Sequence, residues 1–429
     1  MRVTVIGAGY VGLVTGAGLA ALGHRVRVGE ADQERVRQLS SGHVPIFEPD
    51  LDRLVRDGLG NGLLSFHRSN IEAAEGAEVV FIAVPTPERD DGAADVSIVE
   101  WVIGEVGSHL QEGALVVLKS TVPVGSAKRF QDLLDGVGAN VVVLSNPEFL
   151  REGSAVADFF HPDRIVIGSK DQRAVEQMVQ LYTALDAPIV VTDAVSSEMI
   201  KYGANAYLAT RVTFANAMAN LCEAVGADAR DVLLGMGYDR RIGFHFLNPG
   251  PGFGGSCFPK DLSALLRAAA EVGHELLIVR ATEQVNGRQK HLLGKKILAH
   301  FDGSLEGVTI AVWGLAFKPQ TVDIREAPAL ALIDDLLAAG ATVQAHDPQA
   351  MAHVRALYGS RVLLSDGMYG AAEGADALVL VTEWHEYRRP DFHRLKRILR
   401  TANLFDGRNM WEPDELRGMG FAYAGIGRR

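Results

Sequence analysis

A cysteine inside a glycine-rich run is the feature of this sequence that points most directly to a reaction. Cys257 follows Gly254-Gly255-Ser256, and Lys260 and Asp261 come within four residues of it. Glycines allow a backbone to approach a ligand closely or to adopt a positive φ. A cation beside a thiol stabilises the thiolate, which is the nucleophilic form of cysteine. We therefore expect Cys257 to attack an electrophilic carbon, whereas Cys222 is expected to be a small core residue.

A second chemical pattern lies at the N-terminus. A strand of β-branched residues at 3–6 leads into Gly7-Ala8-Gly9-Tyr10-Val11-Gly12, a helical segment follows, and a strand at 25–29 ends at Glu30. In this context the glycines form the turn, admit a pyrophosphate and allow close helix packing, while the helix N-terminus binds phosphate. Glu30 would accept hydrogen bonds from a ribose 2′-hydroxyl and repel a 2′-phosphate, which favours NAD over NADP. Arg35 is a candidate contact for an adenosine phosphate.

Three further strands are predicted in the first half of the chain, at 79–84, 115–118 and 141–144. The residues that follow these strands are mostly polar: Thr86, Ser120, Thr121, Asn146, Pro147 and Glu148. Ligands of an open parallel sheet bind outside the carboxyl ends of its strands. We therefore expect these residues to line one crevice.

The C-terminal part of the chain repeats the N-terminal pattern. Ile310-Ala311-Val312-Trp313-Gly314 parallels the first strand and its glycine, and the segment 371–376 parallels 73–78. This predicts a second doubly wound α/β domain from about 305 to 429. Gly314 is followed by Leu315-Ala316-Phe317-Lys318 instead of two more glycines. We therefore expect this domain to bind a different phosphate compound, with Lys318 as a point charge.

The sequence between the two halves predicts helices. A proline-free segment at 196–225 places Lys201 and Asn205 four residues apart, on one helix face. A second helical region begins near Asp261, is broken around Gly273 and runs on past residue 288.

These patterns predict an α/β protein with two doubly wound, Rossmann-like domains joined by a central, mostly helical region. The expected boundaries are 1–195 for the NAD-binding domain, 196–304 for the central region and 305–429 for the C-terminal domain. The helical centre is a natural place for a dimer interface.

Composition excludes several classes of partner. The 429-residue chain is 48% hydrophobic, has a formal net charge of -11 and contains no block of Lys and Arg, which argues against nucleic acid and acidic membranes as partners. Two cysteines cannot form a disulfide framework and indicate a reducing compartment. The 13 histidines show no ligand-like cluster, so we expect no metal. Without a signal-like leader or a long apolar run, a soluble cytoplasmic protein is expected.

Motifs along essentially the whole chain resemble the UDP-glucose/GDP-mannose dehydrogenase family of nucleotide-sugar 6-dehydrogenases. They are Gly7-Ala8-Gly9-Tyr10-Val11-Gly12, Val84-Pro85-Thr86-Pro87, the segments 120–125, 146–153 and 198–205, the Cys257 loop, Phe317-Lys318 and Asp323-Ile324-Arg325-Glu326. Beyond the fingerprint glycines, the resemblance implies NAD contacts at Val11, Glu30, Arg35, Thr86, Thr121, Glu152, Lys260 and Arg325. It implies substrate contacts at Glu148, Phe149, Leu150, Arg151, Glu152, Lys201, Asn205, Phe246, Leu247, Asn248, Pro249, Gly250, Gly254 and Lys318. It also implies a homodimer in which Arg241 reaches the neighbouring substrate site.

The activity that the resemblance implies is the oxidation of UDP-glucose at C6 to UDP-glucuronate, with two NADH formed per sugar. The first hydride leaves an aldehyde, to which the Cys257 thiolate would add as a thiohemiacetal, and the second leaves a thioester that water hydrolyses. Asp261 or Lys201 would be the base of the first step, and Asp261 or Glu148 would activate the water. Lys201 and Asn205 would stabilise the oxyanions. The expected catalytic set is Cys257, Lys201, Asn205, Asp261, Glu148 and Thr121.

Three alternatives compete with this interpretation. The same chemistry on GDP-mannose or a UDP-N-acetylhexosamine keeps the enzyme class, although Ser256 and the segment 246–250 look more like the UDP-glucose branch. A two-electron dehydrogenase of the hydroxyacid type shares the Lys-x-x-x-Asn pair, but it leaves the Cys257 loop and the C-terminal domain unexplained. A non-catalytic NAD sensor has no use for a thiol beside a lysine and a carboxylate.

Overall fold

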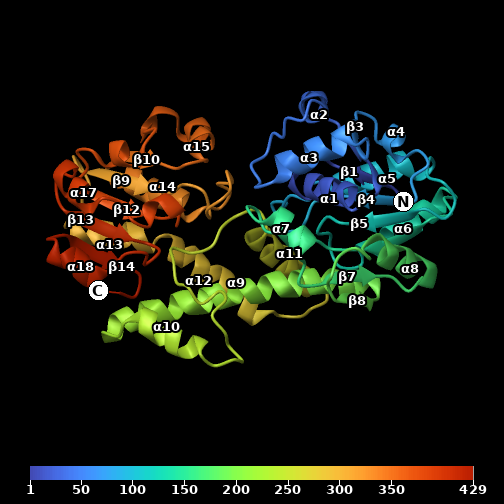
Figure 1. The fold of residues 1–429 in the computed structure, drawn as a ribbon. Coiled ribbons are helices and arrows are strands. Elements are labelled where there is room, and N and C mark those ends of the chain that lie inside the picture. Colours follow the sequence, from blue (N-terminus) through green and yellow to red (C-terminus); the bar gives the residue numbers. More distant parts are fainter. Residues whose placement is uncertain (429) are drawn as a thin grey trace. The chain divides into compact units, whose positions relative to one another are not determined.

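The computed structural model describes residues 1–428 of the chain, which form two compact units. The first unit comprises Met1–Ala204 and Ser263–His274. The second comprises Asn205–Leu262 and the described chain from Glu275 onward. Each unit has its own β-sheet (Figure 1).

The sheet of the first unit has eight strands in the order β3-β2-β1-β4-β5-β6-β7-β8. They are β1 (Arg2–Ile6), β2 (Arg25–Gly29), β3 (Leu64–His67), β4 (Val79–Ile82), β5 (Leu115–Leu118), β6 (Val142–Ser145), β7 (Ile165–Gly168) and β8 (Ile189–Thr192). All neighbours pair in parallel except β6 and β7, which meet antiparallel. The parallel pairing brings the carboxyl ends of β1, β2, β4, β5 and β6 to one edge.

Helices cover both faces of the centre of this sheet, where β4 and β5 are buried on both sides. Val79 and Phe81 of β4 belong to one core, and Val80 and Ile82 belong to the other. The first core contains residues of α1, α2, α3, α7 and α8, and the second contains residues of α4, α5 and α6. The bounds are α1 (Tyr10–Ala21), α2 (Gln33–Ser40), α3 (Leu51–Gly60), α4 (Asn70–Ala74), α5 (Ser97–Gly107), α6 (Ser126–Gly136), α7 (Ala155–Phe160) and α8 (Gln172–Leu181).

The sheet of the second unit has six parallel strands in the order β11-β10-β9-β12-β13-β14. They are β9 (Thr309–Trp313), β10 (Thr342–His346), β11 (Val362–Leu364), β12 (Ala377–Leu380), β13 (Asn403–Asp406) and β14 (Ala422–Gly425). This order repeats the order of the first six strands in the other sheet. The prediction of two doubly wound sheets is therefore confirmed.

The remaining elements of the second unit are helical. They are α10 (Ala229–Gly237), α12 (Leu277–Lys290), α13 (Leu292–His300), α14 (Pro328–Ala338), α15 (Met351–Tyr358), α16 (Met368–Ala372), α17 (Phe392–Ile398), α18 (Pro413–Gly418) and the 3-10 turns η1 (Gly359–Arg361) and η2 (His385–Tyr387).

The boundary between the two units falls within two helices, after Ala204 in one and after Leu262 in the other. The long helix α9 (Ala194–Val225) contains the predicted helical segment (Figure 1). Helix α11 (Phe258–Glu271) begins three residues before the predicted start at Asp261, because proline is tolerated in the first turn of a helix and Pro259 occupies that turn. None of the helices within residues 1–428 is long and apolar enough to cross a bilayer.

Candidate active site

The fingerprint glycines form the turn between β1 and α1. Gly7 has φ +100°, and a Cβ on it would lie 2.6 Å from the carbonyl oxygen of Ala83. A Cβ on Gly12 would lie 1.8 Å from the carbonyl oxygen of Gly7, so this position also requires glycine. At Gly9, by contrast, a Cβ would meet nothing within 4 Å. The backbone at Gly9 is therefore open on this side, and the half-buried Val11 lies in the first turn of α1, whose N-terminus can bind a phosphate.

Glu30 follows the last residue of β2 and holds the fingerprint turn. Its Oε2 accepts a hydrogen bond from the backbone N–H of Ala8 at 3.0 Å, and its Oε1 accepts one from Asp32 at 2.9 Å. Arg35 Nη1 lies 3.4 Å from Oε2. A carboxylate has about four lone-pair sites, so Glu30 keeps capacity to accept hydrogen bonds from a ribose diol. The observed contacts are therefore compatible with NAD at this turn.

The equivalent carboxylate of the second sheet is Asp347, and it has no such capacity. Its side chain is fully buried and accepts five hydrogen bonds, from the backbone N–H groups of Leu315, Ala316, Gln349 and Ala350 and from Nε1 of Trp384, at 2.7–3.0 Å. All hydrogen-bonding sites of the Asp347 carboxylate are therefore occupied by groups of the protein itself, and none is left for a ribose. This agrees with the absence of the second and third fingerprint glycines after Gly314.

Two of the predicted cofactor residues meet at the carboxyl edge of the first sheet. The buried hydroxyl of Thr86 donates to the carbonyl oxygen of Thr121 at 2.9 Å. The segment after Thr121 is fixed by Glu198, whose carboxylate accepts from the backbone N–H groups of Gly125 at 2.5 Å and Ala127 at 2.9 Å. Burial raises the pKa of Glu198, and those two N–H groups oppose the rise.

Glu148 and Lys201 form a buried ion pair in the same unit. Nζ of Lys201 lies 2.9 Å from Oε1 of Glu148 and 2.8 Å from its carbonyl oxygen, and the side chains are only 5% and 7% exposed. Burial alone would raise the pKa of Glu148, but the Lys201 ammonium and the N–H of Leu150 outweigh it and hold the pKa below its usual range. Glu148 is therefore ionised at neutral pH.

The residues after Glu148 form a loop with mixed exposure. Phe149 stacks under the guanidinium of Arg164, whose carbon lies 3.4 Å from the ring centre. Arg151 is exposed and forms an ion pair with Asp158, while Leu150 and Glu152 are half-buried.

Two residues that were not among the predicted site residues, Tyr10 and Glu48, fix this loop. The N–H of Gly153 donates to Oε2 of Glu48 at 2.6 Å and to the hydroxyl of Tyr10 at 2.8 Å. Burial, with Glu48 as a close hydrogen-bond partner, raises the pKa of Tyr10. Glu48 lies 105 residues from Gly153, so no local pattern reveals this contact.

Cys257 lies directly before the first residue of α11, in the second unit. Its carbonyl oxygen accepts the N–H of Asp261 at 2.9 Å, which begins the hydrogen-bond pattern of the helix. Its Sγ lies 3.6 Å from Oγ of Ser256, and the residue is half-buried. The positive end of a helix dipole stabilises a thiolate. Pro259 in the first turn is the sequence signal that could have placed this helix start.

Asp261 is held by two neighbours of the predicted set. Nδ2 of Asn205 donates to its Oδ2 at 2.6 Å, and the Lys260 ammonium contacts its Oδ1. Asp261 is 2% exposed, so these contacts compensate the burial of its charge. Lys201 and Asn205 thus have separate carboxylate partners, Glu148 in the first unit and Asp261 in the second.

The predicted substrate segment of the second unit is an irregular loop. Phe246 has φ 60°, a strained value for a bulky residue, and such strain clusters at ligand sites. Leu247 and Gly250 are buried, Pro249 is half-buried and Asn248 is exposed.

The Cys257 loop contacts the segment that carries Arg325. A Cβ on Gly254 would lie 2.1 Å from the carbonyl oxygen of Glu326, so only glycine fits there. The N–H of Gly255 donates to the carbonyl oxygen of Arg325 at 2.8 Å. The Arg325 side chain is exposed and is paired with Asp323 at 2.7 Å, and Lys318 is half-buried with its Nζ 5.5 Å from the Phe317 ring centre.

The predicted residues therefore divide between the units. The first unit holds Gly7, Gly9, Val11, Gly12, Glu30, Arg35, Thr86, Thr121, Glu148, Phe149, Leu150, Arg151, Glu152 and Lys201. The second holds Asn205, Arg241, Phe246, Leu247, Asn248, Pro249, Gly250, Gly254, Cys257, Lys260, Asp261, Lys318 and Arg325.

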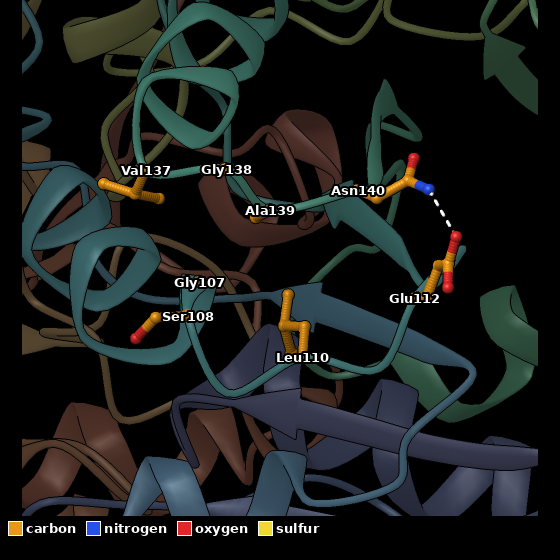
Figure 2. A pocket seen from close by; sticks show the side chains of 8 residues that line it. All are labelled: Gly107, Ser108, Leu110, Glu112, Val137, Gly138, Ala139 and Asn140. Carbon is orange, nitrogen blue, oxygen red and sulfur yellow. Dashed lines mark hydrogen bonds between the residues drawn. The ribbon is translucent and has the colours of Figure 1, made fainter.

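A shallow hollow in the first unit lies away from these residues (Figure 2). It is lined by the loops that precede β5 and β6, and Asn140 at its rim donates to Glu112 at 2.8 Å. The hollow is therefore at the amino ends of these strands, opposite to the edge at which doubly wound sheets bind ligands.

A doubly wound sheet with a glycine turn and an acid after its second strand defines a dinucleotide-binding protein. Three family models match this chain: the NAD binding domain of the UDP-glucose/GDP-mannose dehydrogenase family at residues 1–186, the central domain at 195–288 and the UDP binding domain at 311–413. The chain belongs to this family. The predictions of family and of NAD as cofactor are confirmed.

Individual relatives are similar over the full chain. The UDP-glucose 6-dehydrogenase of Pseudomonas aeruginosa is 49% identical, with 100% of this chain and 98% of that protein covered. The solved UDP-glucose dehydrogenase of Pyrobaculum islandicum has a TM-score of 0.92 and 37% identity, covering 100% of this chain and 98% of that one. The UDP-D-ManNAc dehydrogenase of Pyrococcus horikoshii has a TM-score of 0.88 and 27% identity, covering 100% and 99%.

Proposed function

We propose that this protein oxidises UDP-glucose at C6 to UDP-glucuronate through a thioester on Cys257. The substrate is supported by the named activities of the relatives at 49% and 37% identity. The thioester route rests on one observation, the position of Cys257 at the N-terminus of α11 with Lys260 and Asp261 in the first turn. A two-electron alcohol oxidation has no use for such a thiol.

The proposed reaction balances over four steps. The C6 alcohol loses a proton to a base and a hydride, giving an aldehyde. The Cys257 thiolate adds to the aldehyde carbon, and the resulting thiohemiacetal loses a second hydride to give a thioester. Water adds to the thioester and the C–S bond breaks, releasing the carboxylate and the thiol. NAD, when bound, accepts each hydride, so one sugar and one water reduce two NAD⁺.

The protein's own residues supply the proton transfers and the charge stabilisation. Asp261, oriented by Asn205 and Lys260, is a candidate base, as is Lys201, and Asp261 or Glu148 is the candidate that activates the hydrolytic water. Lys201 and Asn205 are the proposed donors to the oxyanions of the tetrahedral stages. The neighbouring Glu148 carboxylate favours the charged form of Lys201, which suits the donor role, whereas the base role requires the neutral amine.

The experiment that tests this proposal is the end-point absorbance of NADH with limiting UDP-glucose and excess NAD⁺. Two NADH per sugar are expected. One NADH per sugar would mean that the aldehyde escapes, which would overturn the thioester route. No NADH with UDP-glucose, but turnover of GDP-mannose or a UDP-N-acetylhexosamine, would overturn the substrate assignment and leave the chemistry in place.

Replacement of the nucleophile separates the remaining alternatives. Cys257→Ser should stop the reaction before product release in a four-electron enzyme. In a hydroxyacid-type dehydrogenase the substitution should leave the activity unchanged, and in a NAD sensor it should leave NAD binding unchanged. Cys222→Ala is the matched control, because Cys222 is buried in the core of the second unit. The control should keep two NADH per sugar.

A homodimer is part of the proposal. Tyr207, Phe214 and Leu221 of α9 are seven residues apart and 62%, 50% and 53% exposed. Residues at this spacing lie along one side of a helix, and such an apolar stripe is typical of an interface. Arg241 is 88% exposed, and Asp239 holds its guanidinium at 2.6 Å. This exposure supports the expectation that Arg241 reaches the substrate site of the neighbouring subunit.

Three further predictions remain part of the proposal. The domain boundaries at 195 and 304 are retained. A cytoplasmic location is supported by the two free cysteines, Cys222 and Cys257. No metal ion has a role in the proposed reaction.

A further inference from the structure

The loop that leads to Cys257 is buried although it has no regular secondary structure. Residues 250–255 are all buried and lie in neither a helix nor a strand. Buried backbone N–H and C=O groups need hydrogen-bond partners, and a buried loop has no neighbouring strand or helical turn to supply them. For Gly250 and Phe253 the partners are amide side chains.

Three such side chains satisfy both polar groups of two loop residues. Asn286 accepts the N–H of Phe253 at 2.8 Å and donates Nδ2 to the carbonyl oxygen of Phe253 at 3.0 Å. Asn216 accepts the N–H of Gly250 at 2.8 Å, and Gln289 donates Nε2 to the carbonyl oxygen of Gly250 at 2.8 Å. We call Asn216, Asn286 and Gln289 the amide clamp.

The clamp residues are buried and come from two helices. Asn216 of α9 is 1% exposed, and Asn286 and Gln289 of α12 are 5% and 2% exposed. Gln289 is itself oriented by Asn220, whose Nδ2 donates to its Oε1 at 2.8 Å. Asn286 makes two bonds to Phe253, and Gln289 bonds to both Gly250 and Asn220, so each of these two buried amides has one orientation and fixes the loop backbone.

The loop is also fixed on its other side, next to Cys257. Gly255 is hydrogen-bonded to the backbone of Arg325, and Gly254 lies against the backbone of Glu326 with no room for a Cβ. A Cβ on Gly252 would lie 3.0 Å from Oδ1 of Asn286. Because the backbone is confined on both sides, a shift at Phe253 would be transmitted to Cys257.

We infer that the amide clamp consists of positioning residues that set the location of Cys257 and of the proposed substrate segment 246–250. The inference rests on the proposed role of Cys257 as nucleophile. A displacement of about 1 Å at a reacting group costs on the order of 100-fold in rate. The clamp therefore controls the rate of the reaction beyond its contribution to stability.

The test compares Asn286→Ala with Thr282→Ala. Thr282 lies one turn earlier on α12, is 3% exposed and bonds to Thr210 at 3.0 Å and to the carbonyl oxygen of Ile278 at 2.9 Å. It is a buried polar residue of the same helix and is not part of the clamp. We expect a similar loss of Tm in both variants, with kcat on UDP-glucose at least about 10-fold lower in Asn286→Ala and within about 2-fold of wild type in Thr282→Ala.

The second readout is the number of NADH formed per sugar, which a loss of stability alone would not change. In Asn286→Ala the aldehyde should escape before Cys257 traps it, so the end point should fall below two NADH per sugar, while Thr282→Ala should keep the wild-type value. Equal end points together with equal kcat values in the two variants would overturn the inference. If Asn286→Ala does not fold, Gln289→Met, which removes the bonds of Gln289 to Gly250 and to Asn220, replaces it under the same criteria.

Failure of the clamp can be told apart from failure of the proposed function. If the wild-type protein itself gives one NADH per sugar, the thioester route is wrong. Amide hydrogen exchange then tests whether the clamp holds the loop backbone. Faster exchange of the segment 250–255 in Asn286→Ala than in Thr282→Ala would support the clamp. Equal exchange in the two variants would overturn it.

Discussion

Nζ of Lys201 bonds to both the carboxylate and the carbonyl oxygen of Glu148, at 2.9 and 2.8 Å. Two contacts to one residue tie the beginning of α9 to the loop after β6. Because the pair is buried, each charge depends on the other for its stabilisation.

Lys201→Met should therefore destabilise the protein as well as inactivate it. Loss of one partner of a buried ion pair costs about 3–5 kcal/mol, and loss of an oxyanion donor costs roughly 100-fold in kcat or more. Urea unfolding and NADH formation measure the two effects. The double variant Lys201→Met with Glu148→Gln is the control, because it should recover most of the stability without the activity.

The Lys201 contribution should also depend on pH in one direction. The folded pKa of Glu148 lies below its ordinary value of 4.5, so the ion pair stabilises the fold above that value, and the stabilisation is lost as the pH falls further. The stability difference between wild type and Lys201→Met should narrow below about pH 4.5. A difference that stays constant down to pH 3 would contradict an ionised pair.

Lys119 gives stability a second pH dependence. Its cause is the burial of a charge, whereas the first one comes from the pairing of two charges. Burial lowers the pKa of this lysine to about 8, and its ammonium donates to Asn146 at 3.1 Å. Below pH 8 the lysine is protonated in both states and the cost of burial is fully present. Between pH 8 and its ordinary value of 10.5 the folded protein releases the proton first, so wild type should gain stability relative to Lys119→Met, by about 3 kcal/mol at most.

Denaturant unfolding at pH 7, 9 and 10.5 checks this prediction. Lys119→Met leaves Asn146 with the Tyr182 hydroxyl as a partner at 2.7 Å, so the variant does not create an unsatisfied amide oxygen. A stability difference that is independent of pH would contradict the lowered pKa.

Glu30→Gln should weaken discrimination between the two dinucleotides. The amide removes the charge that repels a 2′-phosphate but can still accept the hydrogen bond from Ala8. We expect KM for NAD to rise about 10-fold and the preference for NAD over NADP to fall by about 10- to 100-fold. Glu34→Gln is the control, since Glu34 lies in the next helix and is exposed. Equal preferences in the two variants would mean that Glu30 does not contact the ribose.

Phe214→Glu should separate the proposed dimer. A charge in the middle of the apolar stripe on α9 has to be desolvated on association, which costs several kcal/mol. Sedimentation velocity should give a dimer for wild type and a monomer for Phe214→Glu, with activity lost because Arg241 no longer has a neighbouring site. Val272→Glu, at a residue that is 79% exposed and outside α9, should stay dimeric. A dimeric Phe214→Glu would rule out this interface.

Elements whose pattern is local were predictable from the sequence. The segment 3–30 combines β-branched runs, glycines and one acid in a strand–turn–helix–strand order. The structure has β1, α1 and β2 at these positions. The internal repeat revealed the second sheet for the same reason. The short strands β3, β7 and β8 were not predicted.

The start of α11 shows where a local interpretation failed. The prediction placed the start of this helix near Asp261, whereas the helix begins at Phe258 and includes Pro259 in its first turn. The consequence is chemical, since Cys257 then lies at the helix N-terminus.

The sequence by itself determined the residue types of the candidate site and the presence of two doubly wound domains. Tertiary structure alone decided which of these residues are partners. Lys201 pairs with Glu148 across 53 residues, Asn205 with Asp261 across 56 and Asn286 with Phe253 across 33. A hydrogen bond between distant residues depends on how helices and sheets pack against one another. Packing brings together residues whose positions in the sequence follow no common periodicity. The side chains that hold the cysteine loop therefore became visible only in the folded chain.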